Sequence, residues 1–281
     1  MGRTREDQLL SVVNASGFPF QIRVTHLVEA TAARKKWTVL VREHPWADER
    51  SGESGFLDVV LGRDRDSLRL VIECKRAKDS QWVFIRRDTA PKSVELVRCF
   101  VTSNSREEKV GAWGDCIFAP ASVESSFCAV RGDGSSRTPL LERLSAEVCS
   151  ATEAFGRQEL GIEASTSLPL NTLYVPVIVT NVALFECQVK PEAIDIESGS
   201  VNLDDVSFRP IPFIRFRKPL TARHDLSGSG NIQTVNESAE RTVVILGARD
   251  LSKSLEDLRL IDVLPDSPRS RYAARNPQEE S

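Results

Sequence analysis

Two apolar runs separated by a polar turn constrain this chain more than any other stretch. Residues 56–61 and 68–75 are rich in Val, Leu and Ile, and Gly, Asp and Ser lie between them at residues 62–67. Such a pattern predicts a β-hairpin. Three charged side chains interrupt the two runs, namely Asp58, Glu73 and Lys75. Because a half-buried strand normally avoids charge, these three residues are the first candidates for a functional role.

The alternation of side chains along a strand predicts where these charges point. Glu73 and Lys75 share one face of their strand, and Cys74 faces the other way. If the turn closes the hairpin, Asp58 lies beside Glu73 on the neighbouring strand. Two carboxylates and an ammonium on one patch favour a site for a hard cation such as Mg²⁺, with Mn²⁺ as a substitute, because these ions prefer oxygen ligands.

The same residue types suggest a division of chemical roles. Asp58, Glu73 and the backbone carbonyl of Cys74 would supply oxygen ligands, and the cation would neutralise charge on a phosphate. Lys75 would orient the attacking water and stabilise the developing negative charge. This is phosphodiester hydrolysis chemistry. The alternative is a surface hairpin that carries an ordinary cross-strand Glu–Lys pair.

The pattern Asp58 … Glu73-Cys74-Lys75 resembles the signature of the PD-(D/E)xK nuclease superfamily, which has the restriction-endonuclease-like fold. Residues 20–28 and 37–39 look like the first helix and first strand of Mrr-like restriction nucleases. Two departures stand out. Leu57 replaces the Pro of the superfamily's name, and Gln21 occupies a helix position that often carries Glu. Glu29, two turns further along the same helix, is an alternative to Gln21 as an assisting residue.

The resemblance implies both a fold and an activity. The fold would be α/β, a restriction-endonuclease-like αβββαβ core with a β-rich insertion and extra C-terminal strands and a helix. The activity would be that of a Mg²⁺-dependent endonuclease that acts on DNA, in defence against foreign DNA. Cutting both strands of a duplex needs two sites, which favours a homodimer. The alternative is a non-cleaving nucleic-acid-binding or partner-recruiting module on the same fold.

Along the chain, residues 1–75 would form the first part of this core. We expect helices over residues 4–14 and 20–35, with Thr4 as a cap, and a strand over 37–43 on which Trp37, Val39 and Val41 share a face. A polar loop over 44–54 would follow. Glu43 and His44, at the end of that strand, lie near enough in sequence to touch the site, although we assign His44 no catalytic role.

Residues 76–137 are predicted to be the β-rich insertion. Its basic residues are interleaved with Trp82 and Phe84, which predicts a nucleic-acid surface because cations contact phosphates and aromatic planes stack on bases. The alternative places both rings in the core below a solvated face. The basic residues are Arg76, Lys78, Arg86, Arg87, Lys92 and Arg98. A second basic stretch, residues 34–36, is explained by the helix dipole or by a phosphate contact.

Residues 138–264 would complete the core. The expected elements are a helix over 138–156, strands over 173–180, 185–189, 211–216 and 242–246, a mobile loop over 227–240 and a final helix over 250–260. Pro176 would place the first of these strands at an edge or a bulge. Residues 265–281 are polar and are expected to be disordered.

Composition excludes several classes of protein. The net charge of −3 provides no global basic field for binding nucleic acid, so any such contact needs a local patch. The six cysteines include no C-x-x-C pair, which argues against a zinc site. The chain begins MGRTREDQ, which is no signal peptide, and no run of residues is long and apolar enough for a membrane helix. We therefore expect a cytoplasmic protein without a membrane partner.

Overall fold

The computed structural model describes residues 4–35, 37–48, 52–63, 67–77, 81–87, 95–104, 109–131, 139–162, 170–220 and 231–263. The helices are α1 (Arg5–Ala15), α2 (Phe18–Lys35), α3 (Leu140–Ile162), α4 (Ile232–Ala239) and α5 (Leu251–Asp257). The strands are β1 (Thr38–Asp48), β2 (Glu53–Arg63), β3 (Leu68–Lys75), β4 (Gln81–Arg87), β5 (Leu96–Asn104), β6 (Lys109–Ala119), β7 (Val123–Ser125), β8 (Phe127–Val130), β9 (Leu170–Thr180), β10 (Ala183–Val189), β11 (Val206–Pro210), β12 (Phe213–Pro219), β13 (Glu240–Gly247) and β14 (Arg259–Val263).

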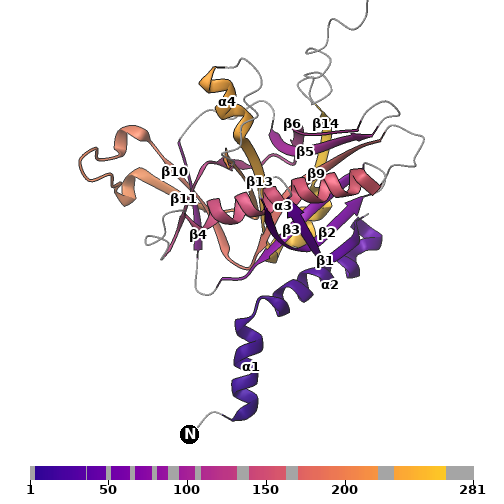
Figure 1. Cartoon of the computed structure of the whole chain (residues 1–281). Helices are drawn as coiled ribbons and strands as arrows, with labels where there is room; N and C mark the ends of the chain where they lie inside the picture. The colour runs from indigo at the N-terminus through magenta and orange to yellow at the C-terminus, as the bar shows by residue number, and fades with distance from the viewer. Residues whose placement is uncertain are drawn as a thin grey trace, which may run out of the picture.

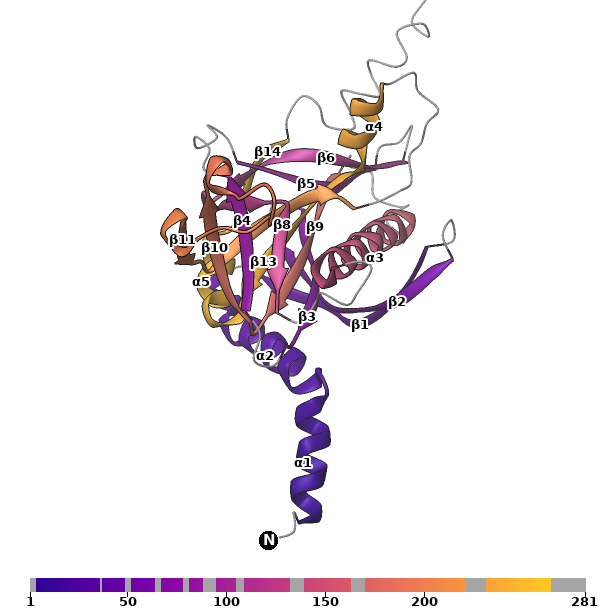
Figure 2. The same cartoon turned by 90° about the vertical axis from the view of Figure 1, so that its left-hand side faces the viewer.

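A ten-stranded mixed sheet forms the centre of the molecule, with helices on both faces (Figures 1 and 2). Alternate residues of its central strands enter different cores, as the period of two requires. Leu70 and Ile72 pack with α2 and α5, whereas Val71 packs with α3. The class expected from the sequence, α/β, is confirmed. Within the described ranges, every helix is too short or too polar to traverse a lipid bilayer.

The sheet order explains the path of the chain. Strands β1, β2 and β3 pair antiparallel in sequence order, α3 crosses over, and β9 then pairs parallel with β3. The order along the main path is β1-β2-β3-β9-β13-β12-β7. A separate four-stranded sheet has the order β11-β10-β4-β8. The order helix, three strands, helix, strand occurs along the chain as α2, β1–β3, α3 and β9, interrupted by β4–β8 between β3 and α3.

The segment expected to be an insertion contributes to both sheets. Strand β4 pairs with β8 and β10 in the smaller sheet, whereas β5 pairs with β6 and β9 in the larger one. Trp82 and Phe84 of β4 are fully buried and pack against the main sheet. Neither ring is therefore available to stack on a base, and the core placement is the one that the structure supports.

Several element boundaries differ from the expectations. The expectation of a polar loop over 44–54 was wrong, because β1 continues to Asp48 and β2 begins at Glu53. Trp46 in this stretch is buried against α3. A register shift between Val39 and Val41 puts these side chains in different cores, so they do not share a face. The expected mobile loop contains α4, and the last helix ends at Asp257 before β14, which pairs with β6. The expected tail over 265–281 lies outside the described residues.

Strand β9 is interior, so the expectation that Pro176 marks an edge was wrong. One side of β9 pairs with β3 along its length. On the other side β9 pairs with β5 up to Tyr174 and with β13 from Val177 onward. Pro176 lies between these two partners. A proline, which lacks an N–H, is tolerated where the ladder changes partner.

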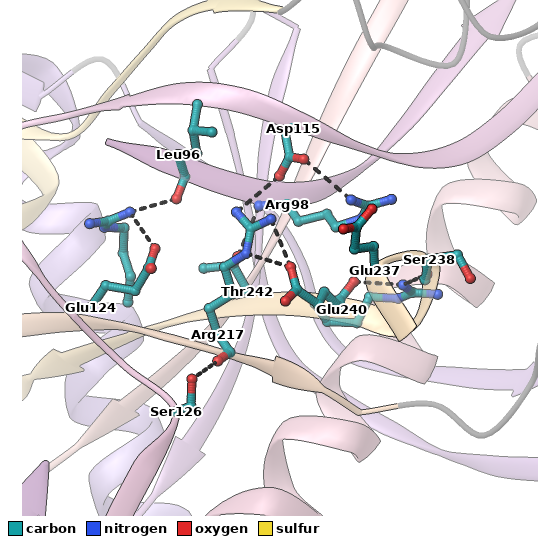
Figure 3. A network of polar contacts seen from close by, with 12 residues as sticks. Leu96, Arg98, Asp115, Glu124, Ser126, Arg217, Glu237, Ser238, Glu240 and Thr242 are labelled. Carbon is teal, nitrogen blue, oxygen red and sulfur yellow. Dashed lines mark hydrogen bonds and ion pairs between the residues drawn. The ribbon is translucent and has the colours of Figure 1, made fainter. Parts of the chain in front are cut away.

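Charged side chains fill the space between β5–β6 and β12–β13, where the two branches of the sheet leave β9 (Figure 3). We call this group the arginine network. It comprises Arg98, Arg215, Arg217, Glu95, Asp115, Glu124 and Glu240. Asp115 binds Arg98 at 3.2 Å and Arg217 at 3.1 Å, and Arg217 also binds Glu240 at 2.9 Å. Each of these cations thus faces an acid.

Arg215 is the most buried member of the arginine network, with a side chain only 2% exposed. Its guanidinium forms ion pairs with Glu95 and, at 2.9 Å, with Glu124. It also donates to Ser122 and to the backbone carbonyl of Leu96. All three guanidinium nitrogens therefore have partners, as a buried charge requires.

Candidate active site

The β2–β3 hairpin brings the three charges of the sequence pattern together. The last registered pair of the ladder is Val59 with Ile72, so Asp58 and Glu73 are opposite each other one step further on. Lys75 follows on the same face of β3 as Glu73. Asp58 Oδ2 accepts a hydrogen bond from the backbone N–H of Cys74 at 2.6 Å. The Asp58 carboxylate therefore ties the two strands together where the registered ladder ends.

Two further carboxyl groups border this hairpin. Glu43 of β1 lies between the registered pairs Arg42–Val59 and His44–Leu57, which places it opposite Asp58. Glu147 comes from α3 and interacts electrostatically with both Asp58 and Glu73. We refer to Glu43, Asp58, Glu73, Lys75 and Glu147 as the acidic cluster. None of these five forms an ion pair with another described residue.

The surroundings of the acidic cluster disfavour negative charge. Burial raises the pKa of Glu73 to about 8, and Asp58 and Glu147 add to that increase against the opposing effect of Lys75. Burial also raises the pKa of Asp58, although the Cys74 N–H lowers it; Glu43 and Glu147 raise it and Lys75 lowers it. Several carboxyl groups thus share one ammonium. Strongly shifted pKa values of this kind are concentrated at functional sites.

Backbone conformation adds a second unusual feature at the same place. Glu43 has a φ of +48°, although it is not a glycine and lies within β1. A left-handed conformation at such a residue costs on the order of 1–3 kcal/mol and is found most often at functional sites. The residue beside it, His44, turns away from the acids. Its ring contacts Gln158 at 2.9 Å and packs edge-on against Phe155.

The two helix residues considered from the sequence have different positions. The side-chain amide of Gln21 donates to the backbone carbonyl of Asp58 at 3.5 Å, so it supports the strand that carries the candidate site. Glu29 is exposed and pairs with Arg42 of β1. Gln21 is therefore the helix residue next to Asp58, whereas Glu29 already has a cationic partner.

The predicted nucleic-acid residues whose side chains the structure describes are bound within the protein. Arg76 donates to the backbone carbonyls of Asn14 and Ser16 at the end of α1. Arg86 pairs with the buried Glu186, which also binds Arg209. Lys78 and the side chain of Arg87 lie outside the described residues, as do Lys92 and the side chains of the basic stretch 34–36. Arg98 belongs to the arginine network.

A cavity of about 580 Å³ opens beside the acidic cluster. Trp46, Glu53 and Ser54 of the β1–β2 hairpin line it, together with the α3 residues Glu142, Arg143, Ala146, Glu147 and Ser150 and with Pro219 and Leu220. Its charged lining is mainly acidic. A second cavity, of about 640 Å³, lies at the arginine network and is lined by Arg86, Arg209 and Arg215, whose charges are paired with Glu186, Glu95 and Glu124. The smaller cavity is therefore the one that a member of the acidic cluster, Glu147, lines.

The donor set is compatible with a hard divalent cation. Carboxylate and carbonyl oxygens are its preferred ligands, and a cation would relieve the repulsion that raises the pKa values of Asp58 and Glu73. Asp58, Glu73 and the carbonyl of Cys74 are the residues that would hold it, with Glu147 facing them. Across the described ranges, no three His, Cys, Asp or Glu side chains are grouped closely enough to enclose a metal ion.

Glu147 was missed by reasoning from the sequence. It lies between Leu144 and Val148, two residues of the buried face of α3. A charged residue at the border of that face was a signal that its side chain lies close to the sheet. No protein-family model, no curated protein and no solved structure matches this chain.

Proposed function

We propose that this protein is a Mg²⁺-dependent nuclease with a restriction-endonuclease-like core, and that DNA is its substrate. One observation carries the proposal: Asp58 and Glu73 lie side by side on β2 and β3 and both interact with Lys75, while Glu147 of α3 adds a third negative charge near them and the described residues offer them no ion pair. When ionised, such a group of carboxylates destabilises the free protein, and a bound proton or a bound cation relieves that cost. The resemblance of Asp58 … Glu73-Cys74-Lys75 to the nuclease signature supports the same reading.

The chain's own residues would divide the work. Asp58, held by the Cys74 N–H, and Glu73 would hold the cation, which when bound supplies charge neutralisation for the phosphate and makes a nearby water more acidic. Lys75 would orient the attacking water through hydrogen bonds from its ammonium and stabilise the negative charge that develops on the phosphate oxygens. Gln21 would keep the β2 backbone in place from the side of α2. Glu147 would face the same cation from α3.

The test is cleavage of single-stranded and double-stranded DNA and of RNA with Mg²⁺ or Mn²⁺. We expect Lys75→Ala and Glu73→Ala each to lower the cleavage rate by more than about 100-fold, because one preorganised charged group typically contributes that much. Lys190→Ala and Glu192→Ala are matched controls, since both side chains are exposed near β10, and should retain full activity. Undiminished cleavage by either active-site variant, with circular dichroism showing a folded protein, would refute the assignment.

The acidic lining of the cavity of about 580 Å³ favours a second candidate function, that of a partner-recruiting module that does not cut. A polyanionic duplex needs cations along its path, and Glu53, Glu142 and Glu147 outnumber Arg143 there. In that case no divalent cation would support cleavage of any nucleic acid, and Mg²⁺ would leave the melting temperature unchanged. A rise in melting temperature with Mg²⁺ concentration favours the nuclease.

A further inference from the structure

Helix α1 exposes an apolar surface that nothing in the described chain covers. Every residue from Thr4 to Ala15 is exposed. Leu9, Leu10, Val12 and Val13 are 52–69% exposed, and Phe18 and Ile22 at the start of α2 are 61% and 67% exposed. We call these six residues the N-terminal stripe. Figures 1 and 2 show α1 projecting away from the body of the protein.

An uncovered helix of this length is not expected to be stable in water. Isolated helices shorter than about 12–15 residues are marginal even with favourable sequences, and α1 has 11 residues. Its capping box, in which Thr4 and Asp7 bond each other's backbone N–H, contributes only about 1 kcal/mol. The helix therefore needs a packing partner, and monomeric proteins rarely leave such a patch open.

We propose that the partner is a second copy of this chain, with the two α1 helices packed antiparallel about a two-fold axis. The charges along the helix favour this arrangement. Glu6 and Asp7 outnumber Arg5 in the first turn, whereas Arg76 lies at the last turn and donates to Asn14 and Ser16. Antiparallel packing puts the acidic end of each helix beside the cationic end of the other, and a two-fold interface repeats that contact twice.

The size of the N-terminal stripe suits a dimer interface. Full burial of one large apolar side chain removes on the order of 100 Å² of apolar area from water. Burying the exposed part of all six side chains would therefore remove about 400 Å² of apolar area from water in each copy. A standard interface buries about 800 Å² per partner, of which roughly 56% is apolar. The stripe thus supplies about the apolar share of one such interface.

The position of Arg76 gives the pairing a further consequence. Arg76 directly follows Lys75, so the interface would border the acidic clusters of both copies. Two sites beside one two-fold axis suit cleavage of both strands of a duplex. This consequence rests on the proposed function, whereas the pairing itself does not.

The experiment is a measurement of mass by sedimentation equilibrium on the full chain from about 1 to 100 µM, the range in which a standard interface dissociates if it is weak. We expect twice the chain mass of 31.2 kDa for the wild type and 31.2 kDa for Leu10→Glu/Val13→Glu. Each substitution at the centre of an interface weakens association by more than about tenfold. The matched control is Ile196→Glu/Leu203→Glu, whose targets are 94% and 78% exposed outside the stripe and which should stay dimeric.

Hydrogen exchange supplies a second readout that does not depend on enzymatic activity. In the wild type, the amides of residues 5–15 should be protected, and in the Leu10→Glu/Val13→Glu variant they should exchange freely while β3 and β9 stay protected. Glu6→Arg should weaken the dimer about twofold to fivefold. A wild-type mass of 31.2 kDa at 100 µM would overturn the proposal, as would an unchanged dimer in the stripe variant. A monomer that binds anionic lipid vesicles through α1 would assign the stripe to a membrane surface instead.

Discussion

The acidic cluster and the arginine network both place several charges between strands, but only one of them is balanced. In the arginine network, Arg98, Arg215 and Arg217 each bind one or more acids at the distances of ion pairs. In the acidic cluster, Asp58 and Glu73 both interact with Lys75, and the described residues provide no ion pair to any of its carboxyl groups. Burial acts on both groups, so the difference lies in the availability of partners.

That difference separates charges that are paired within the fold from charges that are not. When a charge is buried, well-placed ion pairs and hydrogen bonds can offset the cost of removing it from water. Arg215 has such partners in Glu95, Glu124, Ser122 and Leu96. At the acidic cluster, burial and then the charges of Asp58 and Glu147 raise the pKa of Glu73 to about 8, so this carboxyl group keeps its proton at a higher pH than an exposed one. Removing a charge should therefore lower the free energy of unfolding in the arginine network and raise it in the acidic cluster.

The largest change in stability is expected at the arginine network. Arg215→Met should lower the free energy of unfolding by about 3–5 kcal/mol, because it breaks the ion pairs of a buried guanidinium and leaves the partly buried Glu95 and Glu124 without this cation. Urea denaturation measures this difference. As the control, Arg157→Met removes a partly exposed pair with Glu153 and should cost less than about 1 kcal/mol. Equal losses from the two substitutions would contradict the structural role of the network.

At the acidic cluster, removing a charge is expected to stabilise the protein. Glu73→Gln should raise the free energy of unfolding above pH 8 by about 1–3 kcal/mol, since one unit of pKa shift corresponds to about 1.4 kcal/mol and solvent relaxes part of it. Thermal unfolding of Glu73→Gln and of Glu192→Gln, an exposed control, makes the comparison. A variant less stable than the wild type at that pH would show that the Glu73 charge is compensated.

The same shift gives the wild type a pH dependence. Below pH 4.5 the Glu73 carboxyl is protonated in both states, and between pH 4.5 and about 8 only the folded state holds the proton. The contribution of Glu73 to stability is therefore full below pH 4.5, falls as the pH rises through this window, and is lost above about pH 8. A melting temperature that falls more steeply over this window in the wild type than in Glu73→Gln is the expected result.

Divalent cations should weaken this pH dependence. Mg²⁺ should raise the melting temperature more at about pH 8.5 than at about pH 6, because a ligand carboxyl must lose its proton before it binds. The expected stabilisation is about 2.7 kcal/mol at a concentration 100 times the dissociation constant. Differential scanning calorimetry with Mg²⁺ and with an equal ionic strength of NaCl separates binding from screening. Equal effects of the two salts would argue against a cation site.

The smallest effect is expected at Glu29. This residue is exposed and pairs with the exposed Arg42, and such pairs contribute about 0–1 kcal/mol. Glu29→Gln should leave stability within that range and cleavage within about twofold of the wild type, a ratio that corresponds to about 0.4 kcal/mol. A loss of cleavage comparable to that of Glu73→Ala would instead place Glu29 among the residues that act on the substrate.

The sequence predicted those parts of the site that depend on one hairpin. Alternation along β3 was enough to put Lys75 on the same face as Glu73, whereas the position of Asp58 beside Glu73 also depended on the register, which the structure supplies. The roles of these residues in catalysis stay predictions. The order of helices and strands followed from periodicity, because each core strand and helix has a clear apolar face.

The remaining part of the site depends on geometry that single-sequence patterns do not encode. Glu147 reaches the cluster only because of the angle at which α3 crosses the sheet, and that angle is set by packing of many side chains. Glu43 stands opposite Asp58 after a register shift between Val39 and Val41. A bulge of this kind reverses the facing of the residues beyond it, so the simple alternation from Trp37 to Val41 misplaced them.

The fork in the sheet at Pro176 has a consequence for self-association. Where β5 and β13 diverge from β9, their facing backbone groups would form unpaired strand edges, and such edges recruit strands from other molecules. Side chains of β12 and β13 form hydrogen bonds with these backbone groups on β5. Arg215 donates to the carbonyl of Leu96, and the Thr242 hydroxyl accepts a hydrogen bond from the N–H of Arg98. By bonding these backbone groups, the side chains between the two branches of the sheet also make the strand edges less able to pair with a strand of another molecule.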